Sequence, residues 1–263
     1  MSILIAFLIV SILGLLLGFG LSVAEKKLSV EQDPKLVELQ SIMPGANCGG
    51  CGYAGCAAYA EAVYNGEAKP GLCSPGGAEL ALRMGSIMGV DVEIKEKMVA
   101  FVHCDGNLDT TKTDYEYSGL SDCNAASLLQ GGPMACKEGC LHLGSCISAC
   151  PVAAISRSDN GKITVDKDKC IGCGSCVAVC PNNVIRLVPY SAEYIVACNN
   201  HLPGGKVKKV CQSGCIGCRL CEIKVDGSPF HIDSFLSSND YSKNQDAGSK
   251  AMEICPQKCI KKV

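Results

Sequence analysis

Residues 170–181 read CIGCGSCVAVCP, and this stretch decides the fold. Its cysteines follow the spacing C-x2-C-x2-C-x3-C, and a proline comes directly after the last of them. This spacing is typical of segments that hold a [4Fe–4S] cluster through thiolates. The chain has 21 cysteines in 263 residues, an odd number that does not suit a set of paired disulfides. We therefore expect a protein that binds iron–sulfur clusters.

A wider copy of the same motif precedes it at 136–151. Its cysteines are spaced C-x3-C-x5-C-x3-C, and a proline again follows the last. In two-cluster ferredoxins the fourth cysteine of each run binds the other cluster. Two clusters are therefore expected, one on Cys136, Cys140, Cys146 and Cys180, and the other on Cys150, Cys170, Cys173 and Cys176. Between the two runs, residues 157–165 fit a hairpin that turns at Asn160-Gly161.

A third group of cysteines lies nearer the N-terminus, where residues 44–56 read PGANCGGCGYAGC. The glycines allow the backbone to approach a bulky group closely and to point N–H groups at it. The expected ligands are Cys48, Cys51, Cys56 and Cys73, with short helices at 57–63 and 78–88. This set favours a [4Fe–4S] cluster, while tetrahedral zinc is the alternative.

The C-terminal region reads as a damaged copy of the two-cluster motif. One run keeps its first three cysteines but has Val225 in place of the fourth, and the other keeps only the Cys-Pro at its end. Because the fourth cysteine of each run binds the other cluster, the four missing ligands all belong to one cluster. They are the positions now held by Val225, Gln245, Gly248 and Ala251. The other cluster keeps its complete set, which is Cys215, Cys218, Cys221 and Cys255. The sequence thus favours one retained cluster over a module that has lost both.

Five cysteines fall outside these sets: Cys104, Cys123, Cys198, Cys211 and Cys259. In a reducing cytoplasm their default state is the free thiol. Cys211 precedes Cys215 by four residues and is an alternative ligand for the C-terminal cluster. The four histidines show no paired ligand spacing, and no CxxCH for covalent haem occurs.

The N-terminal residues predict a membrane anchor. Residues 1–24 contain no charged side chain, and the first charges follow at 25–27. A hydrocarbon core of about 30 Å needs roughly 20 helical residues. Because Lys26, Lys27 and Lys35 all follow the apolar run, the remaining chain is expected on the cytoplasmic side of a bacterial or archaeal membrane. A cleaved signal peptide is the alternative, but it would begin with positive charge and have a shorter apolar region.

Composition and motifs exclude several other functions. The formal net charge is −2, which argues against binding to nucleic acid. No GxGxxG or GxxxxGK[ST] loop for a nucleotide is present.

The expected organisation is α+β: an anchor at 1–26, a cluster domain at 27–90, a connecting segment at 91–130, a two-cluster ferredoxin domain at 131–190 and a degenerate ferredoxin-like domain at 191–263.

These motifs, in this order, resemble one family over essentially the whole chain. An apolar helix, the segment PGANCGGCGYAGC and then ferredoxin repeats closely resemble the B subunit of the Rnf complex, an ion-translocating ferredoxin:NAD oxidoreductase. The damaged C-terminal module departs from the long members of that family, which carry a complete second ferredoxin module.

The resemblance implies an electron-transfer subunit with no catalytic residues of its own. It would accept electrons from reduced ferredoxin and relay them to integral membrane subunits and to subunits that bind flavin and NAD. A structural metal-binding or redox-sensing protein, which would show no turnover with ferredoxin, is the alternative of another class.

Overall fold

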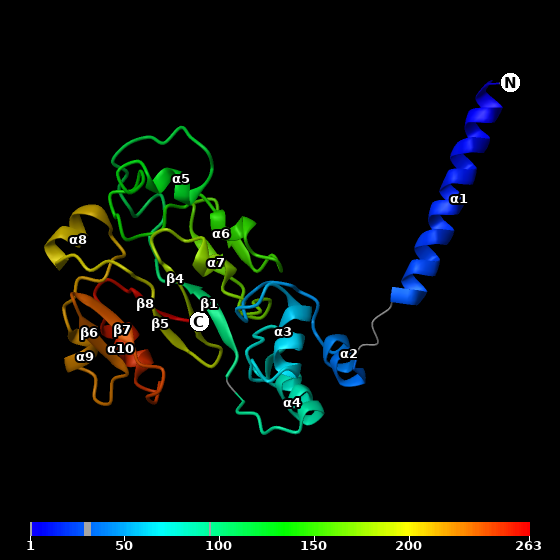
Figure 1. Ribbon diagram of the computed structural model, residues 1–263. Coiled ribbons are helices and arrows are strands. Elements are labelled where there is room, and N and C mark those ends of the chain that lie inside the picture. The colour runs from blue at the N-terminus through cyan, green and yellow to red at the C-terminus, as the bar shows by residue number, and fades with distance from the viewer. Residues whose placement is uncertain (1, 29–32, 95) are drawn as a thin grey trace.

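The computed structural model of the chain describes residues 2–28, 33–94 and 96–263. Short helices and two-stranded antiparallel sheets make up an α+β protein (Figure 1). The buried residues form several small clusters, each with cysteines among or against its members. The expected α+β organisation is therefore confirmed.

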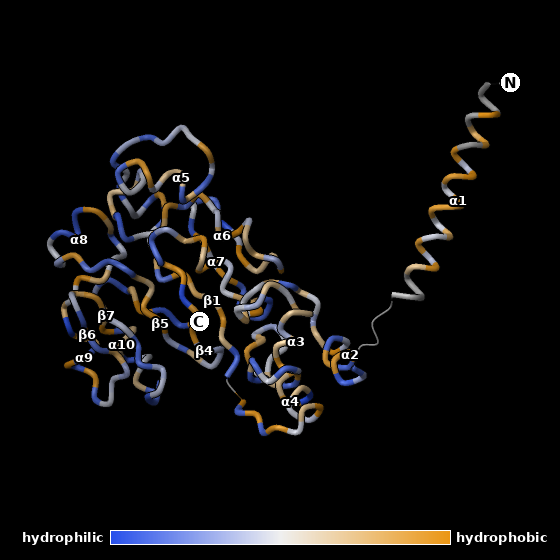
Figure 2. Tube along the Cα trace, in the orientation of Figure 1, coloured by the Kyte–Doolittle hydropathy of each residue, from blue (hydrophilic) through white to orange (hydrophobic). Residues whose placement is uncertain are grey.

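The first helix, α1 (Ser2–Leu28), stands apart from the other units (Figure 1). Its described side chains are mostly apolar and exposed to solvent, among them Phe7 at 74% and Leu15 at 75%, and it is largely orange to white in Figure 2. Counted over the described residues alone, no helix offers a stretch long and apolar enough to cross a membrane. A helix is thus present in the region 1–26, while its role as an anchor stays a prediction.

Three helices build the amino-terminal unit: α2 (Pro34–Ser41), α3 (Cys56–Tyr64) and α4 (Gly77–Met88). The helices expected at 57–63 and 78–88 are confirmed as α3 and α4. One large side chain from each helix, Leu39, Tyr59 and Met84, is fully buried at 0% exposure in a shared core. This core fixes the helices around the loop that carries the first cysteines.

The middle unit has a ferredoxin-like order of elements: an outer strand, a helix, a hairpin, a second helix and the returning outer strand. These are β1 (Met98–Val102), α6 (Ser145–Ser148), β2 (Ile155–Arg157), β3 (Ile163–Val165), α7 (Ser175–Ala178) and β4 (Ile185–Pro189). β1 pairs with β4 and β2 with β3, both antiparallel. The expected hairpin is confirmed, with its first strand beginning two residues earlier and Gly161 in the turn at φ +80°.

The C-terminal unit repeats this order, which confirms its ferredoxin-like fold. Its elements are β5 (Tyr194–Val196), α9 (Leu220–Ile223), β6 (Phe230–Asp233), β7 (Leu236–Asn239), α10 (Gly248–Ile254) and β8 (Ile260–Lys262). β5 pairs with β8 and β6 with β7. An additional helix, α8 (Gly204–Val210), follows β5.

Apolar packing surrounds the positions in this unit that lack a cysteine. Val225 is 3% exposed and Ala251 is 0% exposed, and both lie in one core with Tyr194 and Phe230. A Cβ atom added to Gly248 would lie 2.2 Å from the ring of Tyr194. The space beside the missing ligand positions is therefore packed by protein.

The segment expected to connect two domains, 91–130, is instead partly built into the middle unit. Its residues 98–102 are β1, which pairs with β4 along five residue positions. Further along, α5 (Cys123–Ser127) is fixed by its N-cap, because the Asp122 carboxylate accepts the N–H of Ala125 at 2.8 Å. The regular structure in this segment comes from long-range pairing and a local cap that composition alone did not reveal.

Candidate iron–sulfur sites

All 21 cysteines are free of disulfide bonds in the structure. Four cavities are each lined by four or five of them, and a further four cysteines meet in the amino-terminal unit. The cysteines that the sequence grouped lie together, with one exchange described below.

The amino-terminal site comprises Cys48, Cys51, Cys56 and Cys73, the expected set. Burial raises the pKa of the Cys73 thiol, and the neighbouring thiols of the other three raise it further. The loop around these cysteines is held by the Asn47 side chain, which accepts the N–H of Cys56 at 2.8 Å. The Tyr59 hydroxyl donates to the carbonyl of Lys69 and accepts the N–H of Leu72, which fixes the approach to Cys73.

Ferredoxin site I is a cavity lined by the four cysteines expected for the second cluster of the middle unit: Cys150, Cys170, Cys173 and Cys176. The Sγ atom of Cys170 accepts the N–H groups of Ala100, at 3.4 Å, and of Gly172, at 3.5 Å. The Sγ atom of Cys150 accepts the N–H of Ala154 at 3.3 Å. Backbone donors thus point at the sulfurs from β1 and from the motif itself.

Ferredoxin site II differs from the expected set by one residue. Its cavity is lined by Cys123, Cys140, Cys146 and Cys180, whereas Cys136 lines a different cavity. Cys123 is fixed here because its N–H donates to the Ser145 hydroxyl at 2.7 Å, and that hydroxyl donates to Asp122 at 2.8 Å. The structure therefore places Cys123, and not Cys136, with the other three cysteines.

The backbone explains this exchange. The backbone of residues 140–146 follows that of 170–176. His142 has a φ of +60° where Gly172 has +65°, and Gly144 has +88° where Gly174 has +79°. Leu143 therefore occupies the position of Cys173 and leaves one thiol missing. Counting back from Cys150 with the standard spacing also gives Leu143, so this signal was available in the sequence.

The carboxy-terminal site is a cavity lined by the four expected cysteines, Cys215, Cys218, Cys221 and Cys255, together with Cys259. The Sγ atoms of Cys255 and Cys259 lie 3.6 Å apart. The Cys259 thiol, as a hydrogen-bond donor to Cys255, lowers the pKa of Cys255 to about 5. Cys259 occupies the position that Ala154 and Val184 hold after the other two Cys-Pro pairs.

The remaining cysteines form a group that sequence spacing did not indicate. Cys104, Cys136, Cys198 and Cys211 line one cavity, which we call the bridging site, and Cys140, which also lines ferredoxin site II, contributes to its lining. Cys104 and Cys136 are far in the sequence from Cys198 and Cys211, and the spacing of the four follows no cluster motif.

The donor sets fit [4Fe–4S] clusters, which bind four cysteine thiolates. Within the described ranges, no three side chains are arranged around a single point as ligands of one metal ion. A cluster distributes its thiolates over several iron atoms. Burial raises the pKa of the Cys146 thiol to about 11 and that of Cys176 to about 12, so each needs a nearby positive centre to be a thiolate at neutral pH.

Contacts link the amino-terminal site to ferredoxin site I, and that site to ferredoxin site II. The amino-terminal loop approaches ferredoxin site I so closely that a Cβ on Gly50 would meet the backbone of Cys173. Ferredoxin sites I and II share one core, in which Cys146 and Cys176 are both buried. The thiol of Cys146 also contributes, after burial, to the raised pKa of Cys176. These contacts arrange the three sites in a series.

Family profiles match cysteine-rich parts of the chain between residues 43 and 75 and between residues 135 and 224. The profile described as an Fe-S cluster matches residues 43–75. Two profiles described as a 4Fe-4S dicluster domain match residues 135–187 and 169–224.

Curated proteins resemble the chain over nearly its full length. It is 39% identical over 248 residues to the B subunit of the ion-translocating oxidoreductase complex of Methanosarcina acetivorans, and the match covers 94% of each chain. It is 36% identical to the B subunit of the proton-translocating ferredoxin:NAD(+) oxidoreductase complex of Clostridium ljungdahlii, over 100% of this chain and 93% of the relative. It is also 36% identical to the B subunit of the Na(+)-translocating ferredoxin:NAD(+) oxidoreductase complex of Acetobacterium woodii, over 98% of this chain and 78% of the relative.

Proposed function

The chain belongs to the family of B subunits of ion-translocating oxidoreductase complexes, the Rnf family, and we propose that it carries electrons from reduced ferredoxin to the partner subunits of such a complex. The observation that carries this proposal is the series of cysteine-lined sites. A series of contacting sites suits a relay, since electron transfer slows steeply with distance.

Each bound [4Fe–4S] cluster would take up and release one electron, at a potential that hydrogen bonds to sulfur and solvent exposure set. The chain provides both the hydrogen bonds to sulfur and the shielding from solvent. Backbone N–H groups point at Cys150 and Cys170, and Cys170 is 8% exposed. The residues thus hold, orient and desolvate the redox groups.

The proposed ligands follow the cavities. They are Cys48, Cys51, Cys56 and Cys73 at the amino-terminal site, Cys150, Cys170, Cys173 and Cys176 at ferredoxin site I, Cys123, Cys140, Cys146 and Cys180 at ferredoxin site II, and Cys215, Cys218, Cys221 and Cys255 at the carboxy-terminal site. Cys123 takes the place that the spacing predicts for Cys136, because Leu143 leaves a ligand position without a thiol.

We also propose that α1 anchors the chain in a bacterial or archaeal cytoplasmic membrane, with the cluster-bearing units on the cytoplasmic side. Residues 1–24 carry no charge, and side chains such as Leu16 and Phe19 are 64% and 72% exposed. An apolar surface of this kind on a helix is stable when lipid or another apolar partner covers it. Protease protection of α1 in sealed vesicles, with cleavage of the rest from one side only, tests this orientation.

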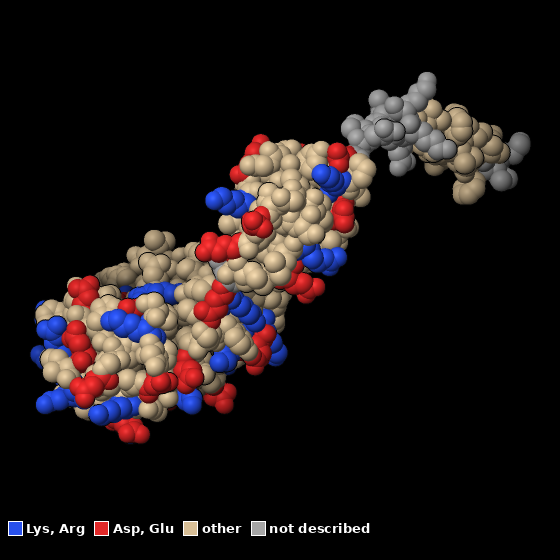
Figure 3. Space-filling view, turned by 90° about the horizontal axis from the view of Figure 1, so that it is seen from below, with Lys and Arg blue, Asp and Glu red and all other residues tan. Residues whose placement is uncertain are grey.

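The proposed partners are reduced ferredoxin as donor, and integral membrane and flavin- or NAD-binding subunits of the complex as acceptors. The overall balance is two one-electron ferredoxins, NAD+ and one proton giving two oxidised ferredoxins and NADH. On the face that Figure 3 shows, basic and acidic side chains are interspersed, in keeping with the net charge of −2. We therefore do not assign a nucleic-acid partner.

Anaerobic stopped-flow reduction of the purified complex by reduced ferredoxin tests this function. The account predicts bleaching of iron–sulfur absorbance before NADH forms, and loss of NADH formation in Cys173→Ser. A complex that reduces NAD+ with ferredoxin at the normal rate in this variant would contradict the relay. Zinc bound without sulfide would favour the structural alternative.

A further inference from the structure

The bridging site stands between the middle and C-terminal units. Cys104 follows the end of β1 by two residues, Cys198 follows the end of β5 by two, and Cys211 directly follows α8. Regular elements therefore deliver three of the four cysteines to one place. The fourth, Cys136, lies in the loop before α6.

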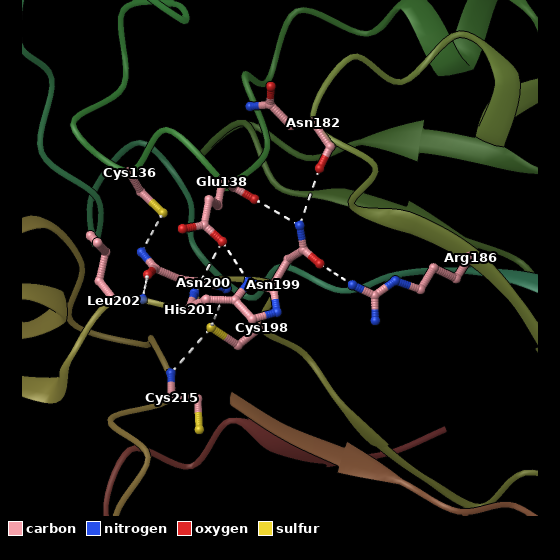
Figure 4. Close-up of polar contacts among 10 residues, drawn as sticks. All are labelled: Cys136, Glu138, Asn182, Arg186, Cys198, Asn199, Asn200, His201, Leu202 and Cys215. Atoms are coloured by element: carbon pink, nitrogen blue, oxygen red, sulfur yellow. Dashed lines mark hydrogen bonds and ion pairs between the residues drawn. The ribbon is translucent and has the colours of Figure 1, made fainter. Parts of the chain in front are cut away.

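Each of the four sulfurs receives a hydrogen bond. Asn200 donates from its side chain to Cys136, at 3.1 Å, and from its backbone to Cys198, at 3.5 Å (Figure 4). The N–H of Cys140 donates to Cys104 at 3.4 Å, and the Thr111 hydroxyl donates to Cys211 at 3.6 Å. Donors that point at sulfur stabilise the thiolate over the thiol.

Asn199, the neighbour of Asn200, links the chain segments that carry Cys136 and Cys198. The Asn199 side chain donates to the carbonyls of Glu138 and Asn182, both at 3.1 Å, and accepts a hydrogen bond from Arg186 (Figure 4). This ties the loop after Cys136 to the segment after Cys198. Cys136 and Cys198, which lie on separate segments of the chain, are thereby held around one cavity.

Glycines leave room beside the sulfurs. A Cβ on Gly106 would lie only 2.5 Å from the Thr111 hydroxyl, which donates to Cys211, and in ordinary contact with the Sγ atoms of Cys104 and Cys211. A Cβ on Gly139 would lie 3.1 Å from the Sγ of Cys136. The bridging site encloses about 370 Å³ including its open mouth, and ferredoxin site II encloses about 380 Å³. The two cavities thus match in size, and each offers at least four thiols.

We propose that the bridging site binds a further [4Fe–4S] cluster through Cys104, Cys136, Cys198 and Cys211. It connects ferredoxin site II with the carboxy-terminal site. On one side the N–H of Cys140, from ferredoxin site II, donates to Cys104, and on the other the N–H of Cys215, from the carboxy-terminal site, donates to Cys198 at 3.2 Å. With this cluster, all five groups of cysteines form one continuous series.

The proposal goes beyond the relay function and is tested separately from it. The full chain, purified anaerobically, is analysed for iron, acid-labile sulfide and zinc. Five clusters correspond to about 20 irons and as many sulfides per chain. The double variant Cys104→Ser/Cys211→Ser is expected to lose about four irons and four sulfides, and one low-temperature EPR signal of the dithionite-reduced chain.

A conservative variant keeps the test decisive if the double variant does not fold. Asn200→Asp retains the acceptor for the N–H of Leu202, which bonds Asn200 Oδ1 at 2.7 Å, but replaces the donor to Cys136 with a carboxylate oxygen. The iron content should stay unchanged while the midpoint potential of a single cluster falls. Asn244→Asp, an exposed site whose amide donates only to Asp246, is the matched control and should shift no potential.

Three results would overturn the proposal. They are about 16 irons per chain in the unmodified protein with the same number in the double variant, one zinc per chain that is lost with Cys104 and Cys211, or an Asn200→Asp chain in which every midpoint potential is unchanged. None of these results would by itself remove ferredoxin-dependent reduction of the other sites, so the relay would stand or fall by its own test.

Discussion

The backbone at Gly50 lies so close to Cys173 that a Cβ atom on Gly50 would be 2.6 Å from the carbonyl oxygen of Cys173. A side chain at this position would therefore separate the amino-terminal site from ferredoxin site I. We expect Gly50→Ala to cost about 1–3 kcal/mol in the packing of these two units. The magnetic coupling between their two reduced clusters, seen as EPR line broadening, should weaken.

The matched control is Gly205→Ala, because a Cβ there meets no atom within 4 Å. Both variants should keep the full iron content. Undiminished broadening in Gly50→Ala would mean that the two sites are not held together by this contact.

Cys123 should be essential to one cluster. We expect Cys123→Ser to lose about four irons, because Cys123 is one of the four cysteines that line ferredoxin site II. Adding Leu143→Cys to this variant should restore much of the iron, since 140–146 has the backbone conformation of 170–176. Iron analysis of the single and double variants checks this. Full iron content in Cys123→Ser would show that another residue, such as Cys136, is the fourth ligand of this cluster.

Cys255 and Cys259 should differ in effect although their sulfurs lie 3.6 Å apart. Cys255 matches the cysteine of the other Cys-Pro pairs, so Cys255→Ala should empty the carboxy-terminal site of about four irons. Cys259→Ala should keep that iron and alter only the potential, because it removes a donor to sulfur. Equal iron loss in the two variants would show that Cys259 also binds the cluster.

Removal of iron should unfold the ferredoxin-like units before the amino-terminal helices. The middle unit has two-stranded sheets and a core that includes Cys146, Cys170 and Cys176. Small units of this kind depend on their metal groups for folding. We expect chelation under air to abolish backbone amide protection in β1 and β4, while α3 and α4 keep part of theirs. Hydrogen exchange measures this, and unchanged protection of β1 in the iron-free chain would contradict it.

Sequence spacing predicted the fold well where ligands are local. The motif at 170–180 indicated the ferredoxin-like unit, and the cysteine run at 215–221 together with the Cys-Pro at 255–256 indicated the damaged copy. It did not indicate Cys123, which lines the cavity of ferredoxin site II in place of Cys136. Cys123 is delivered to ferredoxin site II by a hydrogen bond to Ser145, and such a contact leaves no periodic signal.

The bridging site was missed for the same reason. Cys104, Cys198 and Cys211 are positioned by the ends of β1, β5 and α8, so their proximity depends on tertiary structure. Read singly in the sequence, each was a free thiol. Similarly, β1 was assigned to a linker because its five residues gain regular structure only by pairing with β4.

The most direct test of the central claim is an anaerobic redox titration of the full chain, with iron, sulfide and zinc measured on the same sample. The account predicts equal iron and sulfide, no stoichiometric zinc, and several one-electron reductions at low potential that are fully reversible. Zinc without sulfide, or iron that accepts no electrons, would contradict an electron relay and leave a structural metal protein.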